Sequence, residues 1–191
     1  MDMEKPRFVL PVAARIELRL LGEENAAQLF ALIEGNRAHL REWLPWVDYE
    51  TTVEDSQRFV TRSVQRYLDN EGFDMGIHYQ DQLAGVISFH TVNWPNRQVE
   101  IGYWLGAAFQ GHGIVTGACR TMLEYAFRSL QLNRVTILCA VGNVRSRAIP
   151  ERLGFTQEGI IRDGQWLYDR FVDLVMYSML AREWDALAPA S

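Results

Sequence analysis

The stretch that decides the fold is Phe109-Gln-Gly-His-Gly-Ile-Val115, which joins an apolar run at residues 98–105 to an amphipathic run at 113–130. Two glycines within three residues leave the backbone of this turn unobstructed. The helix that follows presents free N–H groups and a positive dipole end, and such a turn binds phosphate. The same pattern also occurs as a plain strand-to-helix turn. The stretch lacks the Gly-Lys-Ser/Thr ending of a Walker loop and the third glycine of a dinucleotide fingerprint.

Outward from this turn, hydrophobic periodicity predicts a mixed α/β (or α+β) fold with one sheet of about seven strands. The strands are expected at residues 16–20, 73–79, 83–90, 98–105, 135–140, 156–166 and 171–179. Thr52 and Asp55 form a capping box that opens a helix reaching about residue 68. Further helices are expected at about 23–33, up to Trp43, at 113–130, at 146–153 and at 181–187.

Composition indicates one globular domain. The chain has 191 residues, of which 48% are hydrophobic, so residues 1–191 read as a single unit with its core at about 8–187. No apolar run reaches the ~18–20 residues that span a membrane. Met1–Arg7 is charged and lacks the apolar centre of a signal peptide, so a cytoplasmic location is expected. The net charge of −5 argues against a general nucleic-acid binder.

The two cysteines, Cys119 and Cys139, form no Cys-x-x-Cys pair and have no histidine cluster beside them. A disulfide framework is therefore not expected, and neither is a metal site.

A second constellation follows the run at residues 135–140. Asn143 and Ser146 stand at its exit, and Glu151-Arg-Leu-Gly-Phe155 comes shortly after. Asparagine and serine at this spacing cap a helix, and they also hydrogen-bond a ligand. Both interpretations are open for each residue.

Together the two constellations resemble the GNAT acetyltransferase superfamily, in its RimJ/RimL branch and close to the YdaF-type ribosomal N-acetyltransferases. The resemblance is carried by residues 36–48, 99–105, 110–116, 132–135, 141–155 and 180–184, so it covers nearly the whole chain. It implies a central sheet that splays between its fourth and fifth strands, with helices on both faces. Gln110 and Gly113 match the family's Gln/Arg-x-x-Gly-x-Gly/Ala motif, whereas Val115 stands where glycine or alanine is usual and His112 where lysine is common.

Acetyl-CoA is the co-substrate that this resemblance implies. Its pantetheine would pair with the backbone of the splayed strands, and its pyrophosphate would lie on the turn. The implied cofactor-binding residues are Tyr103, Trp104, Leu105, Gln110, Gly111, His112, Gly113, Ile114, Val115, Asn143, Arg147 and Arg152, and Arg145 is a further arginine beside them.

Acetyl transfer to an amine needs a base, because an alkyl amine is mostly protonated at pH 7. Glu100 matches the strand glutamate that serves as base in related GNAT enzymes, although it also fits a solvated strand position. Ser146 would donate a hydrogen bond to the departing sulfur, or act only as part of a cap. Tyr103 and Tyr168 are weaker acid candidates. The branch's base in its closing hairpin corresponds to Gln165, which cannot accept a proton in this way.

The acceptor pocket is expected around aromatic residues on loops and strand ends, which stack on a cationic group or anchor the core. The candidates are Trp43, Trp46, Phe89 and Tyr168, with His90 and Trp94 nearby. The first expected acceptor is the α-amino group of a protein or peptide. The alternatives are a small amine (a polyamine, an aminoacyl-nucleotide or an antibiotic-like toxin) and, in another class, a non-catalytic acyl-CoA-binding module. Dimers occur in this branch, so a homodimer is expected.

Overall fold

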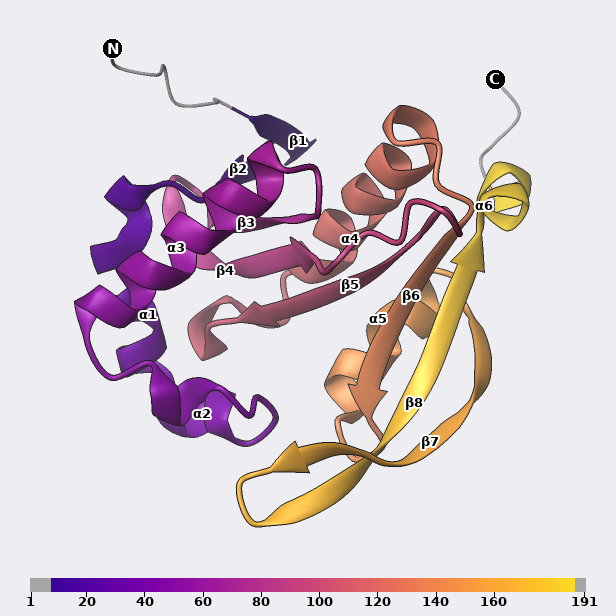
Figure 1. Ribbon diagram of the computed structural model, residues 1–191. Coiled ribbons are helices and arrows are strands. Elements are labelled where there is room, and N and C mark those ends of the chain that lie inside the picture. The colour runs from indigo at the N-terminus through magenta and orange to yellow at the C-terminus, as the bar shows by residue number, and fades with distance from the viewer. Residues whose placement is uncertain (1–7, 188–191) are drawn as a thin grey trace.

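A computed structural model describes residues 8–187, which form one mixed sheet with helices packed against it (Figure 1). Met1–Arg7, the segment considered for a signal peptide, lies outside the described residues. The strands are β1 Val9–Ala13, β2 Ile16–Leu20, β3 Phe73–Tyr79, β4 Gln82–Phe89, β5 Gln98–Leu105, β6 Arg134–Ala140, β7 Thr156–Leu167 and β8 Arg170–Leu180. The helices are α1 Ala26–Gly35, α2 Arg37–Arg41, α3 Val53–Leu68, α4 Ile114–Glu124, α5 Val144–Arg152 and α6 Ala181–Leu187.

Residues 8–187 also contain short helical turns. They are three 3-10 turns, η1 Glu23–Asn25, η2 Val47–Tyr49 and η3 Ala107–Phe109, and one π turn, η4 Tyr125–Ser129. In residues 8–187, no helix combines the length and the apolar character that a membrane crossing requires.

The sheet has eight strands in the order β1-β2-β3-β4-β5-β6-β8-β7. The expected number of about seven omitted β1, an edge strand that pairs antiparallel with β2. This strand is five residues long and contains Pro11, which is tolerated in a sheet only at such an edge or at a bulge. Its pattern therefore gave little sign of a strand.

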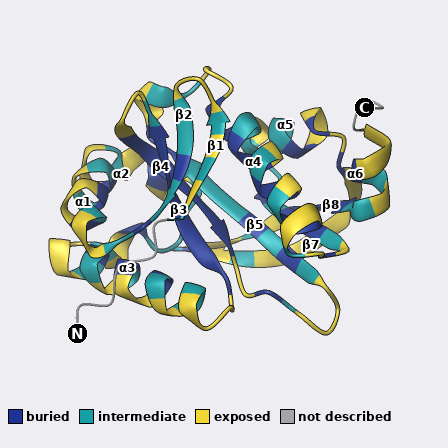
Figure 2. Ribbon diagram, turned by 90° about the horizontal axis from the view of Figure 1, so that it is seen from above, coloured by how far each residue is buried: buried dark blue, intermediate teal, exposed yellow. Residues whose placement is uncertain are grey.

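Two hydrophobic clusters lie on the two faces of the sheet. The larger one joins α4 to β3, β4, β5 and β6, and the smaller one joins α1 and α3 to β4. The central strands β3 and β4 are almost wholly buried between these layers, while the outer faces of the helices are exposed (Figure 2). Helices therefore cover both faces of the middle of the sheet, as expected.

Strands β5 and β6 separate, as the resemblance implied. They pair in parallel only at Gln98–Arg134, Val99–Val135 and Glu100–Thr136. Beyond this point β5 stays paired with β4, and β6 with β8, so the gap opens between them (Figure 1). The two facing edges carry backbone donors and acceptors that no longer meet across a ladder, and an extended ligand can satisfy them.

The local signals that bound the helices are confirmed. The Asp55 backbone N–H donates to Thr52 Oγ1, and the Asp55 carboxylate accepts from the Thr52 N–H, so the capping box opens α3. Helix α4 begins directly after Gly113 and continues through η4 to Ser129. Helix α5 runs past Pro150 without ending.

Candidate active site

The turn between β5 and α4 exposes its backbone. Gly111 and Gly113 have φ values of +82° and +70°, a region that glycine occupies readily and other residues rarely. A Cβ atom on either glycine would meet nothing within 4 Å, so the space over both is open. The N–H groups in the first turn of α4 have no acceptor within the helix and point outward from its N-terminus. The turn has the form of an anion site.

The side chains after Gly113 do not obstruct this surface. Ile114 and Val115 are 1% and 9% exposed and belong to the large hydrophobic cluster. The bulk of Val115, which departs from the family motif, therefore lies in the core. His112 is exposed, with its ring centroid 5.7 Å from that of Tyr79, so only its backbone is placed to serve the turn.

Two arginines of α5 lie beside the turn. Arg145 donates to Gln110 Oε1 at 2.8 Å, and Arg152 donates to Thr116 Oγ1 in the first turn of α4 at 2.8 Å. Both residues are exposed. Their charges reinforce the positive end of the helix dipole where an anionic ligand would lie.

Arg147 does not join them. Its guanidinium donates to the Tyr177 hydroxyl at 3.0 Å and to the Val141 carbonyl at 3.0 Å. It therefore ties α5 to β8 and to Val141, just after β6, and its guanidinium is engaged away from the turn. Of the two arginines, Arg145 is the one that contacts the turn, through Gln110. Nothing in the sequence distinguished these two arginines, because the difference depends on which face of α5 each occupies.

The corner between α1 and α2 holds the other side of the turn. Asn36 accepts the Ala107 N–H at 2.9 Å, and His39 Nε2 lies 2.9 Å from Gln110 Nε2. Gln110 is thus fixed from both sides, because Arg145 can only donate and so orients the amide. No local pattern marks these roles of Asn36 and His39, because their contacts with Ala107 and Gln110 span 71 residues.

Three polar side chains gather where the strands have parted. The Tyr103 hydroxyl donates to the Ser146 carbonyl at 3.0 Å and accepts from Ser146 Oγ at 3.3 Å. Ser146 Oγ also lies 3.2 Å from Cys139 Sγ. Burial raises the pKa of Tyr103 well above its usual value, so its hydroxyl keeps its proton at neutral pH. Burial likewise raises the pKa of the Cys139 thiol.

Asn143 and Ser146 have the capping geometry that was one of their two interpretations. Asn143 Oδ1 accepts the Ser146 N–H at 3.1 Å and begins α5. The cap uses only the backbone of Ser146, so its hydroxyl remains with Tyr103 and Cys139. Capping and a role at the site are therefore compatible for Ser146.

Glu100 occupies the last position where β5 and β6 pair. Its side chain is 32% exposed, and its Oε1 lies 3.0 Å from His90 Nδ1. Tyr103 lies three residues further along the strand, with its side chain on the α4 side. The strand thus brings a carboxylate to the point of separation and a hydroxyl to the open part.

The residues expected in the acceptor pocket lie in different environments. Phe89 is 0% exposed and packs against Phe73 with 5.0 Å between ring centroids, so it belongs to the core and cannot line a pocket. Trp46 packs beside Trp104 at 6.0 Å, in the cluster under α1 and α3. Trp43 lies against Gly142, where a Cβ atom would be 3.4 Å from its ring.

Residues 37–50, which we call the acceptor-side segment after the expected acceptor residues Trp43 and Trp46, reach the tip of the β7–β8 hairpin. Tyr168 donates to the Leu44 carbonyl at 2.5 Å, and Gln165 donates to the Trp43 carbonyl at 3.3 Å. The Arg41 guanidinium lies 3.9 Å from the Tyr168 ring centroid.

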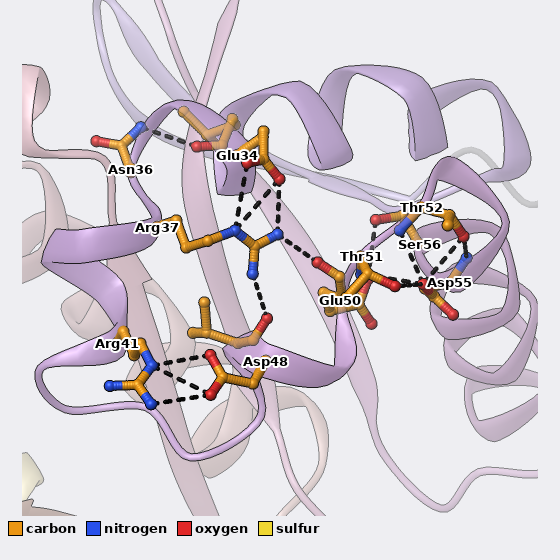
Figure 3. Close-up of polar contacts among 12 residues, drawn as sticks. Glu34, Asn36, Arg37, Arg41, Asp48, Glu50, Thr51, Thr52, Asp55 and Ser56 are labelled. Carbon is orange, nitrogen blue, oxygen red and sulfur yellow. Dashed lines mark hydrogen bonds and ion pairs between the residues drawn. The ribbon is translucent and has the colours of Figure 1, made fainter. Parts of the chain in front are cut away.

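The acceptor-side segment is also braced internally (Figure 3). Arg37 donates to the Val47 and Glu50 carbonyls at 2.6 Å each, and Arg41 pairs with Asp48 at 2.9 Å. The segment and the hairpin therefore meet through defined polar contacts, although they are more than 100 residues apart in sequence.

Two solved structures share this fold and bind the expected donor or its product. RimL, a ribosomal alpha-N-protein acetyltransferase in complex with coenzyme A, has a TM-score of 0.89 at 30% identity, covering 92% of this chain and 99% of that one. The microcin self-immunity acetyltransferase MccE, in complex with acetyl-CoA and AMP, has a TM-score of 0.86 at 32% identity, covering 88% and 94%.

Sequence comparison gives the same family. The curated protein "Putative ribosomal N-acetyltransferase YdaF" of Bacillus subtilis (strain 168) is 42% identical over 179 residues, 93% of this chain and 98% of the relative. The family model for the acetyltransferase (GNAT) domain matches residues 15–156. With the open turn, the flanking arginines and the separated strands, these matches show that the chain belongs to the GNAT family of N-acetyltransferases, which take their acetyl group from acetyl-CoA.

Proposed function

We propose that this enzyme acetylates the α-amino group of a protein or peptide by direct attack of the neutral amine on the acetyl-CoA thioester. The observation that carries the proposal is the opening between β5 and β6, which has Glu100 where the strands part and the Tyr103–Ser146 pair further along. The structural similarity to RimL, an alpha-N-protein acetyltransferase, supports a protein acceptor.

The donor would lie along the separated strands. The backbone of Gln110–Val115 would bind the pyrophosphate, assisted by Arg145 and Arg152. The pantetheine would pair with the free edges of β5 and β6. Backbone N–H groups of β5 near Tyr103–Leu105 would meet the carbonyl oxygen as its negative charge develops.

The reaction forms a C–N bond and breaks the C–S bond. The amine gives up a proton to a base at the Glu100 end, and the departing sulfur leaves as a thiolate that accepts hydrogen bonds from the Tyr103 and Ser146 hydroxyls. Burial raises the pKa of Tyr103, so its hydroxyl stays protonated and can donate a hydrogen bond to the thiolate as it forms. Ser146 supports the thiolate through a hydrogen bond.

The test is a thiol-release assay with acetyl-CoA over a panel of acceptors: peptides with free N-termini, their N-blocked counterparts, polyamines and aminoacyl-nucleotides. The proposal expects turnover with free peptides and none with blocked ones, with mass spectrometry placing the acetyl group on the α-nitrogen. Turnover confined to the small amines would overturn the protein acceptor. Binding of acetyl-CoA without turnover of any amine would indicate a non-catalytic acyl-CoA-binding module.

A second candidate acceptor is an aminoacyl-nucleotide. It is favoured by the similarity to MccE, whose structure holds AMP beside acetyl-CoA. The partly exposed Trp43 ring at the acceptor-side segment supports it, because an aromatic face can stack on a base. A Trp43→Ala variant that loses turnover of the nucleotide but retains that of a peptide would favour this acceptor.

We also propose that the enzyme is a cytoplasmic homodimer. Strand β7 is an edge strand with almost every residue exposed, and three large apolar side chains near the hairpin are more than half exposed: Ile160, Trp166 and Phe171. Exposed apolar patches of this kind mark interaction sites. Light scattering of the wild-type protein should give a mass of about twice the 22.0 kDa of one chain. Trp166→Arg should shift the assembly towards the mass of a single chain. A monomeric wild-type protein would exclude the dimer.

A further inference from the structure

His90 and Glu100 form a side-chain pair at the point where β5 and β6 part. Glu100 Oε1 lies 3.0 Å from His90 Nδ1, and the His90 backbone N–H donates to the Glu100 carbonyl at 2.9 Å. An ionised carboxylate can only accept, so Nδ1 carries a proton in this pair. In the neutral imidazole, Nε2 then bears the free lone pair.

The second ring nitrogen lies further along β5. A Cβ atom built on Gly102 would be 2.6 Å from His90 Nε2, and the three atoms nearest to it all belong to the His90 ring. The imidazole therefore covers Gly102, with Nδ1 at Glu100 and Nε2 two residues further on. Because β5–β6 pairing ends at Glu100, Nε2 lies beside the stretch of β5 that the separation exposes.

The end of β4, directly before His90, is held by polar contacts. The Phe89 carbonyl accepts from Arg66 at 2.8 Å, and Arg66 pairs with the buried Asp74 at 3.1 Å. Asp74 also accepts a hydrogen bond from Ser88. The backbone before His90 is thus fixed, while the His90 side chain is 53% exposed and accessible to a ligand.

We propose that His90 Nε2 takes the proton from the acceptor amine and that Glu100 acts through it, orienting the ring and stabilising the imidazolium that forms. In this step the amine N–H bond breaks as the C–N bond forms, the proton passes to Nε2, and the C–S electron pair leaves with the thiolate. The proposal rests on the acetyl transfer argued above and changes the residue that performs it. A carboxylate that orients a histidine base is a recurrent arrangement in acyl transfer.

The test uses Glu100→Gln and His90→Ala in the thiol-release assay with the best acceptor of the wild-type enzyme. Glutamine keeps an acceptor for Nδ1–H but no longer takes up a proton. If His90 is the base, His90→Ala lowers kcat by roughly 100-fold or more, leaves the KM for acetyl-CoA unchanged, and affects kcat more than Glu100→Gln does. If Glu100 is the direct base, the order of the two variants is reversed and the proposal fails.

Two further measurements separate chemistry from structure. Added imidazole should restore turnover to His90→Ala, because the site is open to solvent, and failure of this rescue would count against a proton-transfer role. Gly102→Ala keeps both functional groups but places a Cβ against the ring, so kcat should fall while the thermal unfolding temperature holds. Thr91→Ala, an exposed neighbour, is the matched control.

The outcomes distinguish failure of the proposed acetyl transfer from failure of the proposed role of His90. A wild-type enzyme without turnover on any amine would refute the proposed function. A wild-type enzyme with turnover and a fully active His90→Ala variant would refute only the role of His90.

Discussion

At the scale of single residues, the site depends on which atoms are already engaged by the protein. Arg145 and Arg147 are two positions apart, yet one lies at the open turn and the other is bound to Tyr177. Gly111 and Gly113 have no side chain, so the space above the backbone of the turn is open at both residues. Small differences in side-chain direction and backbone angle therefore separate residues that are open to a ligand from residues that are engaged within the protein.

Gly113→Ala should lower the free energy of unfolding by about 1 kcal/mol, because alanine is strained at a φ of +70°. It should also raise the KM for acetyl-CoA, because a methyl group would stand where the backbone approaches phosphate. Urea denaturation and steady-state kinetics measure the two effects. Gly35→Ala is the control, since its Cβ also meets nothing within 4 Å but it ends a helix without a positive φ. Equal effects of both substitutions on stability and KM would contradict the assignment.

Tyr103→Phe and Ser146→Ala test which hydroxyl donates the proposed hydrogen bond to the departing thiolate. The variant that removes the donor should lower kcat roughly 10-fold or more and leave the KM for acetyl-CoA nearly unchanged, because the loss falls in the transition state. Each variant also loses a hydrogen bond worth about 1 kcal/mol of stability. If both enzymes keep wild-type kcat, neither hydroxyl stabilises the departing thiolate.

At the scale of elements, one carboxylate joins three strands. Glu158 of β7 accepts from Arg134 of β6 and from Ser178 of β8. These bonds, led by that from Arg134, lower the pKa of Glu158 from 4.5 to about 2. The Glu158 residue lies at a bulge in the β7–β8 register, where its side chain reaches across β8. This contact helps to hold the C-terminal hairpin against the rest of the sheet.

Glu158→Gln should destabilise the protein at pH 7, and the difference from wild type should shrink as the pH falls. The folded-state pKa is depressed, so the contribution of the carboxylate is present above the unfolded value near 4.5 and disappears as the pH falls towards 2. Urea denaturation at a series of pH values measures it. The exposed Glu42→Gln is the control. A difference that stays constant between pH 7 and pH 3 would rule out the ionised contact as its cause.

At the scale of the whole molecule, the proposed acceptor side is assembled from segments near both ends of the described chain. The acceptor-side segment comes from the first quarter of the sequence and the hairpin tip from the last, and they meet at Tyr168 and Gln165. The proposed donor side is formed by the middle of the chain, around the turn at Gln110 and α5. Changes on the two sides should therefore affect different substrates.

Tyr168→Phe should raise the KM for the acceptor and leave the KM for acetyl-CoA unchanged. It removes the hydroxyl that donates to the Leu44 carbonyl at 2.5 Å and so loosens the segment against the hairpin. Initial rates with each substrate varied in turn measure both constants. Tyr49→Phe removes a hydroxyl from an exposed tyrosine of the same segment and should change neither. A parallel rise in both KM values for Tyr168→Phe would indicate a general loss of structure.

The sequence by itself determined the features that depend on neighbours along the chain. The capping box at Thr52, the turn at Gln110–Gly113 and the order of strands and helices after β1 follow from local periodicity and turn chemistry, and the family resemblance added the separation of β5 and β6. What depends on distant neighbours was decided by the tertiary structure. Phe89 was expected in the acceptor pocket, but the folded sheet buries it completely. Arg147 was expected at the phosphates, but its guanidinium donates to Tyr177 of β8. His90 gained a partner in Glu100 only because β4 and β5 lie side by side, a contact that no local pattern encodes.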